Sequence, residues 1–179
     1  MHLTSHHFSA IRRHMLLALS VSALGGTPAL AADKISVTAS FSILGDLVRV
    51  VGGDRVQVST LVGPDEDAHV FEPRPQDAKT ILASKLVVTN GLGFEPWAAK
   101  LIKSAGYKGE LAVAAQGVKA RNMASEPGHG GHAHHEEDPH AWQSPLNVVV
   151  YARNIAQALA KVDPAGAADY QANAVAYAK

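Results

Sequence analysis

The amino-acid sequence predicts an α/β protein built on an open parallel sheet with helices on both faces. First, short β-branched runs alternate with helix-like segments, which is the spacing of βαβ units. Second, 47% of the 179 residues are hydrophobic, enough for a chain of this length to bury a core. Third, the helix-like segments carry their own start and stop residues. Parallel strands joined by right-handed crossovers bring the loops that follow the strands to one edge of the sheet, where such folds bind ligands.

The first 31 residues have the composition of a secretory signal peptide. Arg12 and Arg13 precede a short apolar run (15–24), and Ala29-Leu30-Ala31 supplies an A-x-A cleavage signature. A membrane-spanning helix needs about 20 apolar residues, twice the length of this run. The chain has no cysteine, which excludes a lipid-modified N-terminal cysteine, zinc-thiolate sites and thiol catalysis. We therefore expect a periplasmic protein that is not lipid-anchored and has no direct membrane insertion after cleavage.

Strands and helices alternate through the next part of the chain. Four strands are predicted from β-branched and aliphatic runs, at 35–40, 56–61, 86–90 and 111–115. Three helices are predicted between them, at about 42–51, 75–85 and 95–105. Start signals precede these helices at Ser42, Pro75 and Pro96, and glycines stop two of them at Gly52-Gly53 and Gly106. The resulting order predicts parallel strands with crossover helices.

The last third of the chain differs in composition. A Gly/His/Glu-rich stretch at 126–138 precedes a predicted helix from about 145 to 161, which Asn147 or Ser144 could cap. Asp163-Pro164 then interrupts the chain, and an alanine-rich helix begins that is still running at Lys179. We expect a signal peptide at 1–31, a lobe at 32–163 and a further helix at 164–179.

The charge composition excludes one class of partner. The chain has 16 basic and 16 acidic side chains, and the basic residues are scattered rather than gathered on one face. Phosphate recognition normally needs a strongly basic face, so we expect no nucleic-acid partner. The ten histidines are many for this length and are clustered, which indicates a metal-binding or pH-sensitive role.

Two histidines lie on the loops where this fold binds ligands. His69 stands in PDEDAHVFEPRPQD after the second predicted strand, and His140 stands in EEDPHAWQSPLN before a helix. A lone loop histidine is usually just solvated, and His140 could be incidental to a capping turn. Two histidines on adjacent loops are stronger evidence, because neutral imidazole is a preferred ligand of Zn²⁺. Trp142 could shield the His140 ring from water.

A second group of histidines has a different character. They lie in EPGHGGHAHHEED and are His129, His132, His134 and His135. The glycines of this tract prevent a fixed geometry, so the histidines cannot form a rigid catalytic site. With the acidic residues that follow, they predict a low-affinity auxiliary site that loads as pH rises through the histidine pKa range. The alternative is a solvated linker.

The sequence contains no complete enzymatic motif. Gly91-Leu92-Gly93-Phe94-Glu95-Pro96 follows a strand as a dinucleotide fingerprint does, but Pro96 stands where the third glycine is required. We interpret it as a tight turn with Trp97 packed inward. A metallohydrolase would need a placed general base, and only Glu72 or Glu95 could serve, with nothing in the sequence to orient either. We expect no enzymatic activity.

These segments together resemble a known family. The signal peptide, ISVTASFSILGDLVRVVGGDRV, AHVFEPRPQDAKTILASKLVVTNGLGFEPW, the His-rich loop and DPHAWQSPLN are similar to the zinc/manganese solute-binding proteins (cluster A-I) of metal ABC importers. The likeness covers essentially the whole mature chain. Its most specific parts are the first-histidine loop with E-P-x-P-x-D and the D-P-H-x-W block.

The resemblance carries expectations about function. It implies that this chain is one lobe of a two-lobed protein, with His69 and His140 as metal ligands and the segment from about 165 as the start of a long linking helix. It implies capture of Zn²⁺, with Mn²⁺ less favoured, and delivery to an ABC permease. Some zinc members carry a glutamate before the first histidine, where this chain has Ala68. The family's other ligands come from a second lobe, so the chain is expected to be an N-terminal fragment. Alternatives are a secreted metallochaperone, a metal-dependent hydrolase and an adhesin-like use of the same fold.

Overall fold

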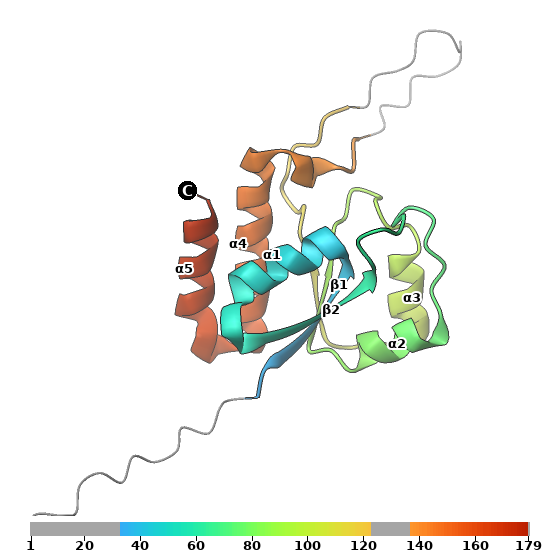
Figure 1. The fold of residues 1–179 in the computed structure, drawn as a ribbon, viewed down its shortest axis with the longest axis horizontal. Helices are drawn as coiled ribbons and strands as arrows, with labels where there is room; N and C mark the ends of the chain where they lie inside the picture. Colours follow the sequence, from blue (N-terminus) through green and yellow to red (C-terminus); the bar gives the residue numbers. More distant parts are fainter. Residues whose placement is uncertain (1–32, 123–136, 179) are drawn as a thin grey trace, which may run out of the picture. The chain divides into compact units, whose positions relative to one another are not determined.

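The computed structural model describes residues 33–122 and 137–178, and within them four strands form one parallel sheet in the order β2-β1-β3-β4 (Figure 1). The strands are β1 (Ile35–Phe41), β2 (Val56–Val62), β3 (Leu86–Thr89) and β4 (Glu110–Val113). β1 pairs with β2 on one side and β3 on the other. The predicted open parallel sheet is confirmed, and each strand lies within about two residues of its predicted bounds.

Five helices cover the sheet in the described residues: α1 (Ser42–Gly52), α2 (Pro75–Leu82), α3 (Ala98–Ala105), α4 (Pro145–Val162) and α5 (Ala167–Tyr177). α1, α4 and α5 pack against one another on one face, and α2 packs against α3 on the other (Figure 1). Alternate residues of β3 show the two faces directly. Leu86 and Val88 belong to the larger apolar cluster, whereas Val87 packs with Leu101 of α3. A strand buried on both faces explains why its sequence reads as a continuous apolar run.

α2 and α4 begin where the sequence predicts, whereas α3 begins three residues later than predicted. α2 starts at Pro75, and the Asp77 carboxylate accepts a 2.6 Å hydrogen bond from the Arg74 N–H, which satisfies a donor before the first turn. α4 starts at Pro145, although neither Ser144 nor Asn147 accepts a capping bond; the Asn147 amide donates to the Ala141 carbonyl. α3 was predicted from 95 and begins at Ala98, because the Glu95 side chain turns back into the preceding loop.

α5 is attached to the rest of the fold by polar contacts at its first turns. The Tyr170 hydroxyl donates to Asp163 Oδ2 at 2.6 Å, and the Arg55 guanidinium pairs with the same oxygen at 2.8 Å. The Asn173 amide donates to the Val51 carbonyl at the end of α1. α5 ends at Tyr177, with Ala178 as its C-cap. Lys179, through which the helix was predicted to continue, lies outside the described residues. The role of α5 as the start of a linking helix stays a prediction.

The strand order fixes where a ligand site can form. β1 lies inside the sheet, with β2 added on one side and β3 and β4 on the other. The crossovers after β1 and β2 therefore run in opposite directions, which makes the carboxyl ends of β1 and β3 a topological switch point. None of the described helices is both long and apolar enough to cross a membrane.

Candidate metal centre

The loop between β2 and α2 carries His69 to the carboxyl-terminal edge of the sheet. The His69 N–H donates to Asp67 Oδ1 at 2.8 Å, which closes a tight turn just before the imidazole. Ala68 is buried, and its carbonyl accepts a 2.6 Å hydrogen bond from the Trp97 indole N–H. The backbone on both sides of the His69 amide is thus fixed, while the imidazole itself is exposed.

His140 reaches the same edge from the segment that precedes the short helix η2 (Ala141–Gln143). Asp138 Oδ1 accepts hydrogen bonds from the His140 N–H at 2.9 Å and lies 2.8 Å from His140 Nδ1. The carbonyl of buried Pro139 accepts from the Asn90 amide at 3.0 Å. The carboxylate therefore fixes the rotation of the ring and the carbonyl fixes the backbone one residue before it.

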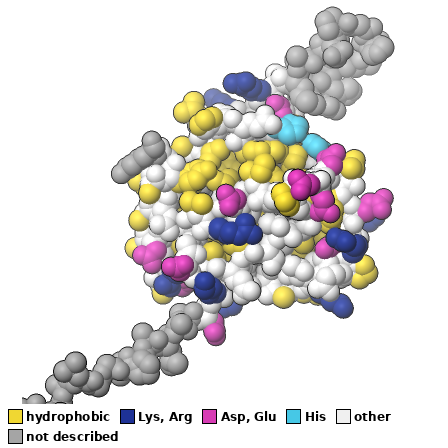
Figure 2. Space-filling model, in the orientation of Figure 1, with side chains coloured by type: hydrophobic (Ala, Val, Ile, Leu, Met, Phe, Trp, Pro, Cys, Tyr) yellow, Lys and Arg dark blue, Asp and Glu magenta, His cyan; other side chains and the backbone are white. Residues whose placement is uncertain are grey.

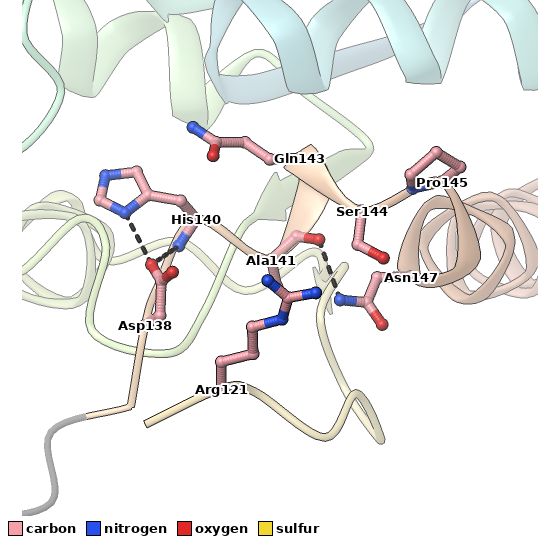
Figure 3. A pocket seen from close by; sticks show the side chains of 8 residues that line it. All are labelled: Arg121, Asp138, His140, Ala141, Gln143, Ser144, Pro145 and Asn147. Carbon is pink, nitrogen blue, oxygen red and sulfur yellow. Dashed lines mark hydrogen bonds and ion pairs between the residues drawn. The ribbon is translucent and has the colours of Figure 1, made fainter. Parts of the chain in front are cut away.

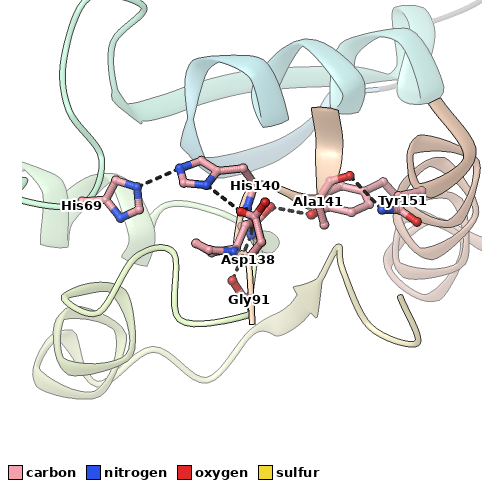
Figure 4. Close-up of polar contacts among 9 residues, drawn as sticks. His69, Gly91, Asp138, His140, Ala141 and Tyr151 are labelled. Carbon is pink, nitrogen blue, oxygen red and sulfur yellow. Dashed lines mark hydrogen bonds and ion pairs between the residues drawn. The ribbon is translucent and has the colours of Figure 1, made fainter. Parts of the chain in front are cut away.

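The structure brings the two predicted histidines together. His69 Nε2 and His140 Nε2 lie 3.1 Å apart, although 71 residues separate them in the sequence, and the two rings point toward each other (Figure 4). Two nitrogens that share a tetrahedral Zn²⁺ at about 2.0–2.1 Å lie about 3.3 Å from each other. An ion could therefore be held by both rings after a shift of a few tenths of an ångström.

The Asp138 contact also sets which ring nitrogen of His140 is free. A carboxylate can only accept, so His140 Nδ1 carries the proton in that bond and Nε2 of the neutral ring has a lone pair facing His69. A carboxylate that holds the second nitrogen of a metal-binding imidazole is a common arrangement, because it fixes the ring and raises its basicity. The sequence reasoning counted Asp138 only as part of the acidic stretch; the D-x-H spacing was the signal for this contact.

Acidic side chains lie beside the histidine pair. Figure 2 shows histidine at the molecular surface with acidic side chains close by. The backbone N–H and then the imidazole of His140 hold the pKa of Asp138 below its ordinary value, with a smaller contribution from Arg121. Asp138 is therefore a carboxylate at neutral pH, which favours a cation at this edge.

Aromatic rings form an apolar floor under the two imidazoles. The Phe94 ring lies 4.5 Å from the His69 ring and 5.6 Å from the His140 ring, centroid to centroid. Phe94 in turn packs against Phe41 and Trp142, at 4.9 and 4.5 Å. Trp142 lies 5.4 Å from His140, in the position that the sequence suggested for a shielding side chain. Phe94 was not singled out from the sequence, because a lone phenylalanine in a turn has no distinctive pattern.

A polar pocket opens on the other side of His140. Its lining includes Arg121, Asp138, His140, Gln143 and Asn147 (Figure 3). Within the described parts of the chain, no three histidine or acidic side chains converge closely enough to hold an ion together. The two imidazoles would thus leave coordination positions for water or for ligands from elsewhere.

Other predicted site residues have different outcomes. His129, His132, His134 and His135 lie outside the described residues. Glu95, which the sequence gave no reason to consider oriented, is buried and held by three hydrogen-bond donors, so that part of the sequence reasoning was wrong. Trp97 packs against Phe71 as an inward-facing side chain, as predicted.

Comparison with known proteins shows the family to which this chain is similar. The family model described as zinc-uptake complex component A, periplasmic, matches residues 37–179. The manganese ABC transporter substrate-binding lipoprotein PsaA of Streptococcus pneumoniae is 31% identical over 169 residues, which cover 91% of this chain and 53% of PsaA. The iron-binding protein YfeA of Yersinia pestis is 33% identical over 162 residues, covering 90% of this chain and 50% of YfeA. The chain thus spans about half the length of these curated relatives.

Solved structures agree with the sequence comparison. The Mn-bound periplasmic metal binding protein from Candidatus Liberibacter asiaticus superposes with a TM-score of 0.71 at 31% sequence identity. The match covers 81% of this chain and 52% of that one. The fold predicted from the sequence is therefore that of known metal-binding proteins. Their names describe binding components rather than enzymes, in agreement with the prediction of no enzymatic activity.

One prediction about location needs correction. The absence of cysteine led us to predict a protein that is not lipid-anchored, yet PsaA and relatives from Streptococcus cristatus and Streptococcus pyogenes are named as lipoproteins. These relatives contradict the exclusion of a lipid anchor, and we withdraw it. Placement outside the cytoplasm agrees with the periplasmic description of the family. From the match over 37–179 and the shared fold, we conclude that the chain belongs to the family of zinc-uptake complex component A, periplasmic.

Proposed function

We propose that this protein captures a divalent transition metal ion outside the cytoplasm, with His69 and His140 as ligands, and delivers it to the permease of an ABC importer. The supporting observation is the 3.1 Å separation of the two Nε2 atoms, on loops that are each held by a side-chain donor bonded to the carbonyl before the histidine. Membership of an uptake-complex family and the transporter names of its relatives support the delivery step.

The metal that the site favours follows from its donor atoms. Imidazole nitrogen suits Zn²⁺, whereas Mn²⁺ prefers a larger share of oxygen ligands. Relatives are named for manganese and for iron, so the donor chemistry of this chain is the argument for zinc. We propose Zn²⁺ as the preferred ion and Mn²⁺ as a weaker one.

The proposal also concerns where the ligands other than His69 and His140 come from. Two imidazoles leave at least two tetrahedral positions unfilled. We propose that residues 32–163 form one lobe after a signal peptide at 1–31, that 164–179 begins a linking helix, and that further ligands come from residues outside this chain. The histidine tract at 126–138 would then act as an auxiliary low-affinity site.

Calorimetric titration of the full chain tests the ligand assignment. All histidines other than His69 and His140 would be changed to Asn, namely His2, His6, His7 and His14 in the predicted signal peptide and His129, His132, His134 and His135 in the tract. We expect one Zn²⁺ per chain, and His69→Ala and His140→Ala should each weaken binding by about tenfold or more, because each removes half of the protein ligands. Mn²⁺ should bind more weakly than Zn²⁺.

A variant in the helix that follows the His69 loop is the control. Gln76→Ala alters an exposed side chain in the first turn of α2 and should leave Zn²⁺ affinity unchanged. Equal affinity in the parent chain and in both histidine variants would show that the ion is not held by this pair.

A further inference from the structure

The loop that follows β3 contacts both histidine loops but carries neither histidine. It contains the Gly91-Leu92-Gly93 turn that superficially resembles a nucleotide motif. All three residues have positive φ, at 87°, 55° and 72°. Leucine rarely adopts this region, so its presence indicates that surrounding contacts fix the turn. Leu92 is packed against the larger apolar cluster, and a side-chain Cβ at Gly91 would meet Val113 at 2.5 Å.

The buried Glu95 side chain accepts hydrogen bonds from the start of this loop. Only 7% of Glu95 is exposed. Its Oε1 accepts from the Ser40 hydroxyl at 2.6 Å and from the Asn90 N–H at 2.5 Å, and its Oε2 lies 3.3 Å from the Gly91 N–H donor. No Lys, Arg or His of the described residues forms an ion pair with it. A buried carboxylate with neutral donors is stable only while those donors stay in place.

Asn90 connects this loop to the His140 segment. It is completely buried, and its amide donates to the Pro139 carbonyl at 3.0 Å and to the Gly91 carbonyl at 2.9 Å. Its Oδ1 accepts a 2.7 Å hydrogen bond from the Tyr151 hydroxyl of α4, whose position is labelled in Figure 4. Burial raises the pKa of Tyr151, and the charge of Glu95 raises it further, so the hydroxyl keeps its proton as a donor. Asn90 thus fixes the carbonyl one residue before the imidazole.

The far end of the same loop connects to the His69 segment. The Trp97 indole donates to the Ala68 carbonyl, again one residue before a histidine. Phe94, between the two ends, contacts both imidazoles with its ring. One eight-residue loop, 90–97, therefore makes matching contacts to both histidine loops.

The geometry points to Glu95 and Asn90 as positioning residues that set the separation of the His69 and His140 Nε2 atoms through the loop 90–97. This inference rests on the proposed function, because it assigns the loop a role in the metal site of that proposal. Ligands held near their bound geometry before the ion arrives bind it more tightly, since less ordering is needed on binding. The turn that resembles a nucleotide motif is thereby explained as a support for the histidine pair.

Variants of Glu95 in the full chain, with the tract histidines changed to Asn, test this inference. Glu95→Ala removes the acceptor for three donors, and we expect Zn²⁺ affinity to fall by about tenfold. Glu95→Gln keeps one oxygen for Ser40 and the Asn90 N–H but turns a second donor toward Gly91, so it should lose less affinity than Glu95→Ala. If Glu95→Ala does not fold, the Zn²⁺ affinity of Glu95→Gln alone tests the inference.

Asp163→Asn provides the matched control for a structural effect. Asp163 also accepts several hydrogen bonds, but at the α4–α5 junction. We expect it to lower the thermal midpoint as Glu95→Gln does while leaving Zn²⁺ affinity unchanged. Unchanged affinity in the folded Glu95 variants, or an equal loss in Asp163→Asn, would overturn the inference.

A metal-free measurement separates this inference from the proposed function. Nitrogen and proton NMR signals of the two rings, assigned by His69→Ala and His140→Ala, should shift in Glu95→Gln and stay in place in Asp163→Asn. These shifts support the positioning role even if neither histidine variant alters Zn²⁺ binding, which would refute the proposed function alone. Unshifted ring signals in Glu95→Gln would refute the positioning role.

Discussion

The two ends of the sheet each contain a mostly buried carboxylate that accepts several hydrogen bonds, but the donors differ. At the carboxyl-terminal edge, Glu95 is held by a hydroxyl and two backbone N–H groups. At the opposite end, Asp163 is held by the Tyr170 hydroxyl and the Arg55 guanidinium. Backbone donors shape the loop to which they belong, whereas an ion pair joins two separate elements. The first arrangement determines the geometry of a loop, and the second attaches a helix.

This difference implies that geometry at the histidine pair and attachment of α5 can be disturbed independently. Substitutions near Glu95 should alter metal binding together with stability, whereas substitutions near Asp163 should alter stability alone. The following three predictions test that separation, beginning with the largest expected change.

Phe94→Ala should produce the largest change. Phe94 is 5% exposed and packs against Phe41, Trp142 and both histidines. Truncating a buried phenylalanine costs about 3–5 kcal/mol, which corresponds to a fall of about 10 °C or more in thermal midpoint for a domain of this size. Zn²⁺ affinity should fall as well, because the floor under both imidazoles is removed. Scanning calorimetry measures the thermal midpoint, and titration calorimetry measures the Zn²⁺ affinity.

Leu101→Ala is the control for loss of core packing alone. Leu101 is buried in the smaller cluster on the other face of the sheet, with Ile81 and Val87. It should lower the thermal midpoint by a comparable amount without changing Zn²⁺ affinity. If Leu101→Ala weakens Zn²⁺ binding as much as Phe94→Ala does, general loosening of the fold explains both results.

Two tyrosines make a closer comparison between the ends. Tyr151 and Tyr170 are both completely buried, and each hydroxyl donates to a side-chain oxygen, of Asn90 and of Asp163 respectively. Tyr151→Phe and Tyr170→Phe should each cost about 1–2 kcal/mol in urea unfolding, because each leaves a buried acceptor with one donor fewer. Only Tyr151→Phe should weaken Zn²⁺ binding, by a few-fold. Equal affinities in the two variants would contradict the separation.

The sequence predicted the architecture because local signals and the final packing agree. β-branched runs separated by Pro75 and the glycines after α1 and α3 were sufficient to place the strands, and the parallel order then put His69 and His140 on one edge. The 3.1 Å separation was not predictable, because it depends on Asn90 and Trp97 donating to carbonyls 49 and 29 residues away. Glu95 was misjudged for the same reason: two of its donors belong to its own turn, but the third is the hydroxyl of Ser40 in β1, 55 residues away.

The smallest expected change is the pH dependence of the α5 attachment. Hydrogen bonds from Tyr170 and Arg55 hold the pKa of Asp163 below its usual value. A carboxyl whose pKa is lowered on folding contributes stability above its unfolded pKa of about 3.9, and this contribution is lost as pH falls through the lower folded value. The stability difference between the parent chain and Asp163→Asn should thus be constant from about pH 7 to 5 and should shrink below about pH 4.

Because Arg55 is one-third exposed, solvent screens the pair and the difference at pH 7 should be only a few degrees in thermal midpoint. Asp169→Asn, which alters an exposed carboxylate 4.0 Å from the same guanidinium, should lower the thermal midpoint at pH 7 by less than Asp163→Asn does. If the Asp163→Asn difference stays constant down to about pH 3, then uncharged contacts rather than the Asp163 charge hold α5 in place.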